Sequence, residues 1–154
     1  MAREINKNFK AESGQTDYTS IHEAPVVSCL IMYRDKVLIV KRSSEVGFYS
    51  DYWSGIGGFL DDAKTPSEKA VQEIGEELGI AKERVLQIEE GNVFRMEDPE
   101  YDKAWIMHPF LIVVDTDAVK LDWEAKDFRW IKPEEVADYR VTPGFQRVVK
   151  CFLA

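Results

Sequence analysis

The chain has 154 residues, of which 45% are hydrophobic and 31% charged, and its formal net charge is −8. This length suits one ordinary domain with its own hydrophobic core. The excess of acidic residues argues against a stable nucleic-acid complex and against binding to anionic membranes, because both surfaces repel a negatively charged protein. An anionic substrate would need a positive group recruited locally, and a divalent cation is the simplest candidate.

Residues 1–20 are polar and show no periodicity, so we expect a flexible or edge-pairing arm, followed by a single domain over residues 21–154. The arm lacks the apolar segment of a secretory signal, and no apolar run approaches the length of a membrane span. The two cysteines, Cys29 and Cys151, form no metal-binding pattern, and Cys29 is expected to be a buried free thiol. Together these features predict a cytoplasmic protein.

The first part of the domain has the pattern of a β-hairpin followed by a loop. An apolar run at 24–33 and a β-branched run at 37–41 flank a polar turn, which predicts two paired strands. Arg42 ends the second run and is a candidate phosphate ligand, although a surface salt bridge is the commoner role. Phe48 and Tyr49 fall in the next loop, where we expect exposed aromatic rings able to stack on a base.

Helix signals frame residues 66–78. Thr65 is a suitable N-cap, Pro66 suits the first helical position, and Glu68 completes a capping box with Thr65. Gly79 follows the last periodic residue, where helices commonly end. The apolar positions fall on one arc at about 100° per residue; they are Ala70, Val71, Ile74 and Leu78. The pattern therefore predicts an amphipathic helix.

Three glutamates share a neighbouring face of this helix. Glu73, Glu76 and Glu77 are spaced at i, i+3 and i+4, so like charges lie one turn apart at a cost of a few tenths of a kcal/mol. A bound cation would compensate this repulsion, and clustered carboxylate oxygens suit Mg²⁺ or Mn²⁺. The alternative is a solvated acidic helix face, which is the usual role of a charge run.

The second part of the domain alternates strands with polar loops. Residues 85–96 predict one or two strands broken near Gly91, and the acidic loop 97–103 is expected to be solvated. Residues 105–115 give the strongest strand pattern, in which Pro109 argues for an edge position or a bulge. His108 lies in the same strand, where a structural or substrate-contacting role is commoner than that of a catalytic base.

The end of the chain predicts a loop at 116–126, a strand at 127–131, a short helix from Pro133 and a C-terminal helix over 142–152. The order of strands, helix, strands and helices is typical of an α+β fold with a mixed sheet between helices.

The segment Gly58–Ile80 resembles the signature of the Nudix hydrolases, and it matches the spacing of that signature over twenty-three residues. That pattern is G, five residues, E, seven residues, R-E-U, one residue, E-E, one residue, G-U, where U is aliphatic. Two positions depart from it, because Lys64 replaces the first glutamate and Gln72 replaces the arginine. The family uses these two charges to hold the loop against the helix and to orient the neighbouring glutamate. Lys64 is a candidate to pair instead with Asp61, Asp62 or Glu68.

The resemblance implies an α/β/α sandwich with a central mixed sheet and metal-dependent hydrolysis of a nucleoside diphosphate derivative. It implies Glu73 and Glu77 as main ligands of Mg²⁺ or Mn²⁺, with Glu76 serving a second ion or its water and the Gly57 carbonyl as a further ligand. Many members carry another acid in a late loop, which makes Glu124 a candidate base or ligand, ahead of Asp122.

Three further expectations follow from the resemblance. The substrate is expected to be a small nucleotide-linked molecule, and a homodimer is possible because dimers are common in the family. The alternative function is a catalytically weak module that senses nucleotides, which the departures at Lys64 and Gln72 make conceivable. An isomerase of isoprenoid diphosphates is disfavoured, because neither cysteine is near the segment in sequence.

Overall fold

The structure is a computed structural model that describes residues 21–153. The predicted arm of residues 1–20 lies outside the described residues. None of the described helices combines the length and the apolar character needed to cross a membrane.

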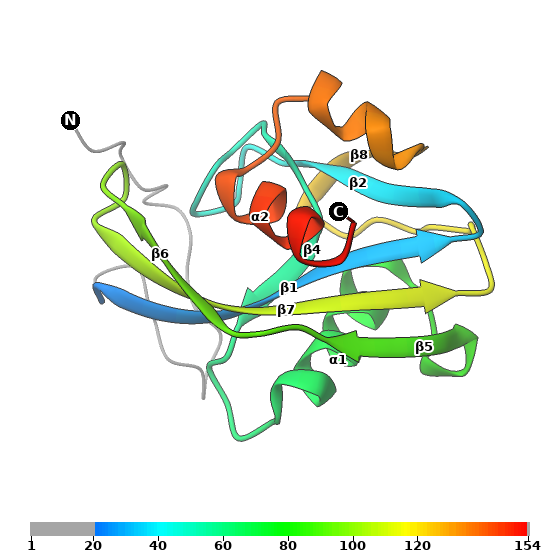
Figure 1. The fold of residues 1–154 in the computed structure, drawn as a ribbon, viewed down its shortest axis with the longest axis horizontal. Coiled ribbons are helices and arrows are strands. Elements are labelled where there is room, and N and C mark those ends of the chain that lie inside the picture. Colours follow the sequence, from blue (N-terminus) through cyan, green and yellow to red (C-terminus); the bar gives the residue numbers. More distant parts are fainter. Residues whose placement is uncertain (1–20, 154) are drawn as a thin grey trace.

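Two long strands form the centre of a mixed sheet. β1 (Glu23–Tyr33) and β7 (Lys103–Val114) run parallel, with paired residues from Glu23 and Ala104 to Met32 and Val113. The other strand pairs are antiparallel, and they extend the sheet on both sides of this pair (Figure 1). On the β1 side lie β2 (Lys36–Arg42), β3 (Trp53–Ser54), β4 (Ile56–Phe59) and β8 (Ala125–Ile131). On the β7 side lie β5 (Val85–Glu90) and β6 (Phe94–Asp98).

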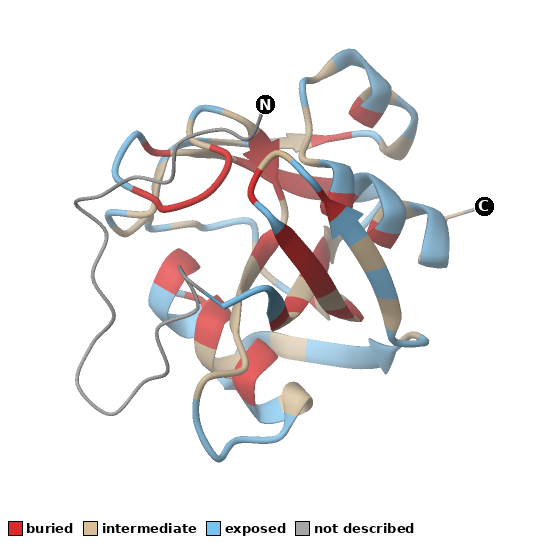
Figure 2. Cartoon of the chain, turned by 90° about the vertical axis from the view of Figure 1, so that its left-hand side faces the viewer, coloured by how far each residue is buried: buried red, intermediate tan, exposed pale blue. Residues whose placement is uncertain are grey.

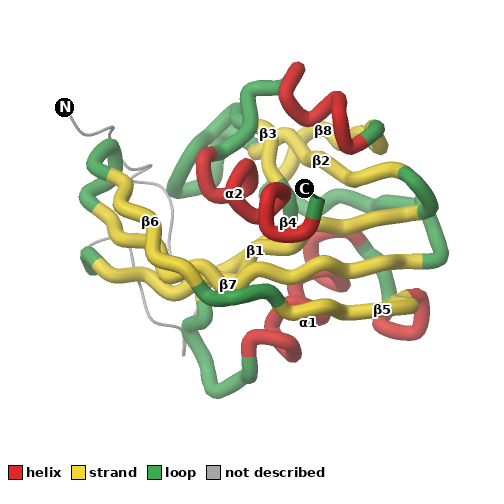
Figure 3. Tube along the Cα trace, viewed as in Figure 1, coloured by secondary structure: helices red, strands yellow, loops and turns green. Residues whose placement is uncertain are grey.

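Helices cover the two faces of the sheet, so the predicted α/β/α arrangement is confirmed (Figure 3). On one face, α1 (Pro66–Leu78) buries Ala70, Ile74 and Leu78 against strand residues that include Phe110. On the other face, α2 (Pro143–Phe152) buries Phe145 and Val148. Successive strand side chains point to opposite faces, which divides the core into two apolar clusters. Figure 2 shows buried residues gathered where helices and strands meet, while most loops are exposed. Two short 3₁₀ helices, η1 (Lys82–Arg84) and η2 (Pro133–Asp138), lie in the connections.

The sequence signals at the ends of α1 are confirmed. The Thr65 side chain accepts a hydrogen bond from the Glu68 amide at 3.2 Å, and the Glu68 side chain accepts one from the Thr65 amide at 3.1 Å. Gly79 ends the helix with φ of 66°, in the left-handed region that favours glycine. The predicted β1–β2 hairpin, the C-terminal helix and the buried thiol of Cys29 are also confirmed, and Thr142 is the N-cap of that helix.

The edge position predicted at Pro109 is wrong, whereas the alternative of a bulge is confirmed on the side that faces β5 and β6. β7 lies inside the sheet, and its pairing with β1 runs through Pro109 without a register shift. The irregularity lies in the segment opposite Pro109, because β5 ends before Gly91 and β6 starts at Phe94. Residues 91–93 there face only His108 and Pro109. Pro109 accepts a hydrogen bond from the Gly91 amide on this side, so its missing N–H faces the break between β5 and β6.

Two loop predictions are also wrong. The loop after β2 is not open to solvent, because Phe48 and Tyr49 are buried in the core. The acidic turn between β6 and β7 is not wholly solvated, because Asp98 is only 4% exposed. Its carboxylate accepts hydrogen bonds from the Tyr49 hydroxyl and from Nε1 of Trp105, which ties the turn to the loop after β2.

Candidate active site

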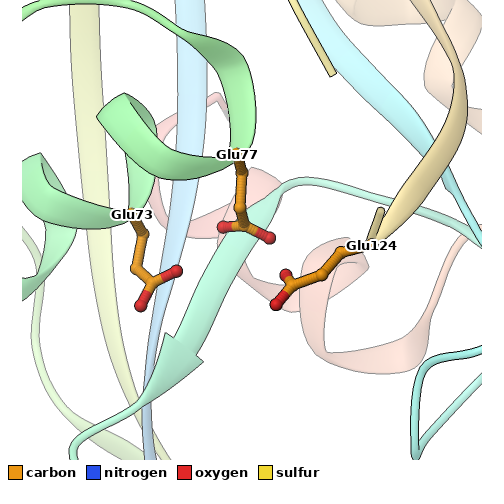
Figure 4. A group of neighbouring side chains, drawn as sticks. All are labelled: Glu73, Glu77 and Glu124. Carbon is orange, nitrogen blue, oxygen red and sulfur yellow. The ribbon is translucent and has the colours of Figure 1, made fainter. Parts of the chain in front are cut away.

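Three carboxylates meet beside the sheet. Glu73 and Glu77 lie one turn apart on the inward side of α1, and both are buried. Glu124 reaches them from the loop before β8, so that one carboxylate oxygen from each residue lies within 4.8 Å of the others. Figure 4 shows the three side chains pointing toward one another. Among the described residues this is the group whose geometry suits a metal ion.

Backbone hydrogen bonds hold the loop that carries Glu124. The Lys120 amide donates to the carbonyl of Leu78 at the end of α1, at 2.8 Å. Further along, the Ser43 amide donates to the Glu124 carbonyl at 2.8 Å, and the Glu124 amide donates to Oδ1 of Asp122 at 3.0 Å. The loop is therefore fastened both to the helix that carries the other two carboxylates and to the end of β2. Asp122 supports Glu124 here and is not part of the three-residue group.

The glycine pair lets the backbone of β4 approach the carboxylates. A Cβ atom on Gly58 would lie 2.7 Å from Oε1 of Glu73, which is closer than Cβ atoms approach other atoms unless one of them shifts. Gly57, in the same strand, pairs with Ser28 of β1 and lines the cavity described below. A side chain at position 58 would therefore displace the Glu73 carboxylate, and the Gly57 carbonyl stays a predicted ligand.

Burial and mutual repulsion disfavour the charged forms of these carboxylates. Burial, with the nearby charge of Glu124, raises the pKa of Glu73 to about 7. Burial and the hydrogen-bonding and charge of Glu124 also raise the pKa of Glu77 well above its usual range. In addition, Oε2 of Glu77 is buried and has no hydrogen-bond partner among residues 21–153. A site with three facing carboxylates and an unpaired buried oxygen lacks positive charge.

A buried lysine that the sequence analysis missed supplies part of that charge. Lys69 is 2% exposed, and its Nζ lies 3.1 Å from Oδ1 of Asp61 and 3.5 Å from Oε1 of Glu73. Burial alone would lower the pKa of Lys69, but the hydrogen bond to Asp61 and the surrounding carboxylates outweigh it and raise the pKa. The available signal was the i, i+4 spacing of Lys69 and Glu73, which places both on one helix face.

The residues that depart from the family pattern make other contacts. Lys64 is exposed and lies 3.4 Å from Oδ2 of Asp62, one of the three partners considered for it. Gln72 donates from Nε2 to Oε1 of Glu76 at 2.8 Å. Glu76 is exposed and lines the cavity, but it is not in the group of carboxylates that meet.

An open cavity of about 490 Å³ adjoins the carboxylates. This volume is within the range of small-molecule sites. Acidic residues form part of its lining, and they come from α1, the loop before it and the loop before β8: Asp61, Glu73, Glu76, Asp122 and Glu124. Apolar side chains from distant segments form another part: Val26, Phe48, Phe59, Met96, Trp105, Met107 and Phe145. The cavity thus combines acidic and apolar walls.

The structure brings some of the candidate substrate-binding residues to the cavity and not others. Phe48 and Tyr49 line the cavity as buried residues, and the Phe48 ring packs edge-on against Trp105 with centroids 5.0 Å apart. Arg42 also lines the cavity and donates from Nε to the Phe48 carbonyl at 2.9 Å. Burial lowers the pKa of Arg42, and the charges of Glu77 and Glu124 oppose that shift. His108 is not among the residues that line the cavity, so the structure does not bring it to the site.

The donor set fits a divalent cation. Carboxylate oxygens are the ligands that Mg²⁺ and Mn²⁺ prefer, and Glu77 offers an oxygen with no other partner in the described part of the chain. Glu73, Glu77 and Glu124 are the residues positioned to hold such an ion.

Comparisons with known proteins agree with this arrangement. The profile of the NUDIX domain matches residues 22–151. Over 96 residues the chain is 29% identical to a provisionally named 8-oxo-dGTP diphosphatase 3 of Mycobacterium tuberculosis. That alignment covers 60% of this chain and 43% of the relative, so the chain spans less than half of the relative's length.

Solved structures share the fold. The NUDIX domain of Shewanella oneidensis NrtR in complex with ADP ribose has a TM-score of 0.70 at 16% identity, covering 94% of this chain and 88% of that one. A MutT protein from Methanosarcina mazei Go1 has a TM-score of 0.68 at 22% identity, covering 85% and 93%. An Ap4A hydrolase of C. elegans has a TM-score of 0.67 at 17% identity, covering 84% and 94%. Identities this low bear on the fold and not on the substrate.

Proposed function

Because the chain belongs to the NUDIX domain family, we propose that it hydrolyses a diphosphate bond in a nucleoside diphosphate derivative with the help of Mg²⁺ or Mn²⁺. The observation that carries this proposal is the meeting of Glu73, Glu77 and Glu124 beside a cavity that Glu73 and Glu124 line together with apolar side chains. The carboxylates suit a cation and the phosphates it would neutralise. The apolar lining suits a base or another planar group.

The chain's own residues have distinct roles in this proposal. Glu73 and Glu77 hold the ion from α1, and Glu124 completes the set or accepts a proton from the attacking water. A divalent cation bound there supplies charge neutralisation for the diphosphate and lowers the pKa of water. Arg42 lies between the carboxylates and the loop after β2, where its guanidinium can bind a phosphate oxygen. Phe48 and Tyr49 form part of the wall beside the substrate.

The charged residues that line the cavity bear on which class of substrate it can bind. The acidic lining outnumbers Arg42 among the charged residues of the cavity, so phosphates enter with their cation. The names of similar proteins suggest the panel to test: 8-oxo-dGTP, ADP ribose and Ap4A. Nucleoside triphosphates and nucleotide sugars complete it.

One product-resolved screen tests the proposal. Each compound is incubated with Mg²⁺, with Mn²⁺ and with chelator, in water enriched in ¹⁸O, and the products are identified by mass spectrometry. We expect cation-dependent cleavage of a diphosphate bond with one ¹⁸O incorporated into one product. Glu83→Gln, an exposed change in η1, serves as the control that should retain activity. Cleavage that persists unchanged in chelator would contradict the cation's role.

The second candidate is a nucleotide-sensing module with little catalysis. Lys64 and Gln72 favour it, because both depart from the family pattern. Calorimetry with Mn²⁺ and each nucleotide separates the two functions. Tight binding without any product would support the module and overturn the hydrolase.

A homodimer, the absence of nucleic-acid partners and a cytoplasmic location stay predictions. Light scattering after size-exclusion chromatography tests the first of them.

A further inference from the structure

Lys69 is buried, and its ammonium lies near three carboxylates. Its ammonium lies 3.1 Å from Asp61, 3.5 Å from Asp62 and 3.5 Å from Glu73. An ammonium group has three N–H donors, so one lysine can serve all three acceptors. Asp61 and Asp62 belong to the loop between β4 and α1, whereas Lys69 and Glu73 belong to the helix. The lysine thus joins this loop to a carboxylate of the proposed metal site.

Helix stability does not explain this lysine. In the pair of Lys69 and Glu73 the cation precedes the anion, which is the less favourable order for an i, i+4 pair. A lysine that is 2% exposed also loses most of its hydration. An apolar residue would suit this buried position on α1 better if packing alone mattered. The position therefore points to a role that involves the carboxylates.

The two residues that depart from the Nudix signature, Lys64 and Gln72, do not contact Glu73. Lys64 is exposed and contacts Asp62, while Gln72 donates to Glu76. The same oxygen, Oε1 of Glu73, also lies beside Gly58, where a Cβ atom would be 2.7 Å away. The carboxylate oxygen that contacts the Lys69 ammonium thus also lies close to the glycine backbone.

We propose that Lys69 is the positioning residue of this site: with Asp61 it fixes Glu73 and the loop before α1, in place of charges at positions 64 and 72. This inference rests on the proposed function, because Glu73 is taken as a ligand of the cation. Lys69 itself touches neither substrate nor cation in this role.

The test removes the lysine without changing the net charge. Loss of the ammonium alone would also alter the electrostatic attraction for a cation, so Lys69→Met is combined with Asp61→Asn. The matched control is Arg84→Met with Asp115→Asn, which removes another Lys/Arg–Asp pair, with an N–O distance of 3.0 Å, outside the cavity lining. Mn²⁺ affinity of the free protein is measured by calorimetry, and kcat and KM are measured over a range of Mn²⁺ concentrations.

Loss of positioning should weaken Mn²⁺ binding roughly 10–100-fold, as is typical when a residue that orients a metal ligand is removed. The activity lost at low Mn²⁺ should return at high Mn²⁺ with KM for the nucleotide little changed, whereas a purely structural defect would persist at every concentration. The control should stay within about twofold of the parent. Unchanged Mn²⁺ affinity in the folded Lys69→Met/Asp61→Asn protein would overturn the proposal.

A second variant keeps Asp61 and remains informative if the first does not fold. Lys69→Met is combined with Lys64→Glu and Gln72→Arg, which restores the family's two charged residues at positions 64 and 72 of the signature. We expect it to fold and to bind Mn²⁺ within about threefold of the parent. Failure to bind would overturn the replacement role of Lys69. If the parent protein itself neither binds Mn²⁺ nor turns over any nucleotide, the proposed function fails instead.

Discussion

Replacing Glu77 by glutamine should make the metal-free protein more stable and the enzyme far less active. Glu77 is buried, faces Glu73 and Glu124, and has one oxygen without a partner in the described part of the chain. Glutamine keeps the shape of the side chain, removes the charge and adds an N–H₂ group that can donate to the two remaining carboxylates. The change therefore relieves the repulsion among the three carboxylates while it removes a proposed cation ligand.

The structure sets the size of both effects. With an effective dielectric constant of about 20, unit charges 4.8 Å apart repel each other by about 3.5 kcal/mol. Partial protonation relieves part of this repulsion, so we expect a net gain of about 2 kcal/mol in the free energy of unfolding at pH 8. For a chain of this size that raises Tm by roughly 4–8 °C. Loss of a ligand to the cation should lower kcat/KM by roughly 100–1,000-fold, or about 3–4 kcal/mol in the barrier.

The assay follows thermal unfolding in chelator and with Mn²⁺, beside the hydrolysis of the best substrate from the screen. Glu76→Gln is the matched control, because it lies next in the same helix but is exposed and outside the meeting group. Its metal-free Tm should shift by no more than roughly 2 °C. Full activity of Glu77→Gln at limiting Mn²⁺, or a fall in its metal-free Tm, would refute the reasoning.

Three further outcomes follow from the same geometry. Without metal, the pKa of Glu73 is about 7 when folded against about 4.3 in an unfolded chain, so the folded state binds more protons in that window. Metal-free stability should therefore fall by about 3 kcal/mol from Glu73 as pH rises from 5 to 8. Urea unfolding in chelator measures the slope, and a shallower slope in Glu73→Gln identifies the Glu73 share, because Glu77 also has a raised pKa and contributes the rest. Gly58→Ala should weaken Mn²⁺ binding at least roughly 10-fold by displacing Glu73, whereas Gly75→Ala, whose Cβ would meet nothing closer than 3.8 Å, should bind normally; equal affinities would contradict the packing argument. Thr65→Ala should cost about 1 kcal/mol by removing the N-cap, and an unchanged urea midpoint would count against the cap.

Local signals account for the parts of the fold that could be predicted. The capping box at Thr65, the left-handed stop at Gly79 and the apolar arc of α1 depend on neighbouring residues, and all three are confirmed. The β1–β2 hairpin is equally local. Pro109 was misassigned to a sheet edge because its missing N–H is tolerated by a break in a different strand, which no pattern around Pro109 reveals. Phe48 and Tyr49 were misassigned because a loop with several serines and a glycine is usually exposed, and their burial depends on Asp98 and Trp105 far along the chain.

The sequence by itself determined the helix, its carboxylate face and the glycine pair before it, because helical periodicity places residues three and four apart on one side. Only the tertiary structure decided which carboxylates meet. Glu124, 47 positions beyond Glu77 in the chain, joins the site because its loop is fastened to α1 and β2. Glu76 stays outside because the helix turns it to solvent. The tertiary structure also shows that the ammonium of Lys69 supplies part of the positive charge that the carboxylates need. Its burial and its contact with the Asp61 loop arise only when the helix packs on the sheet.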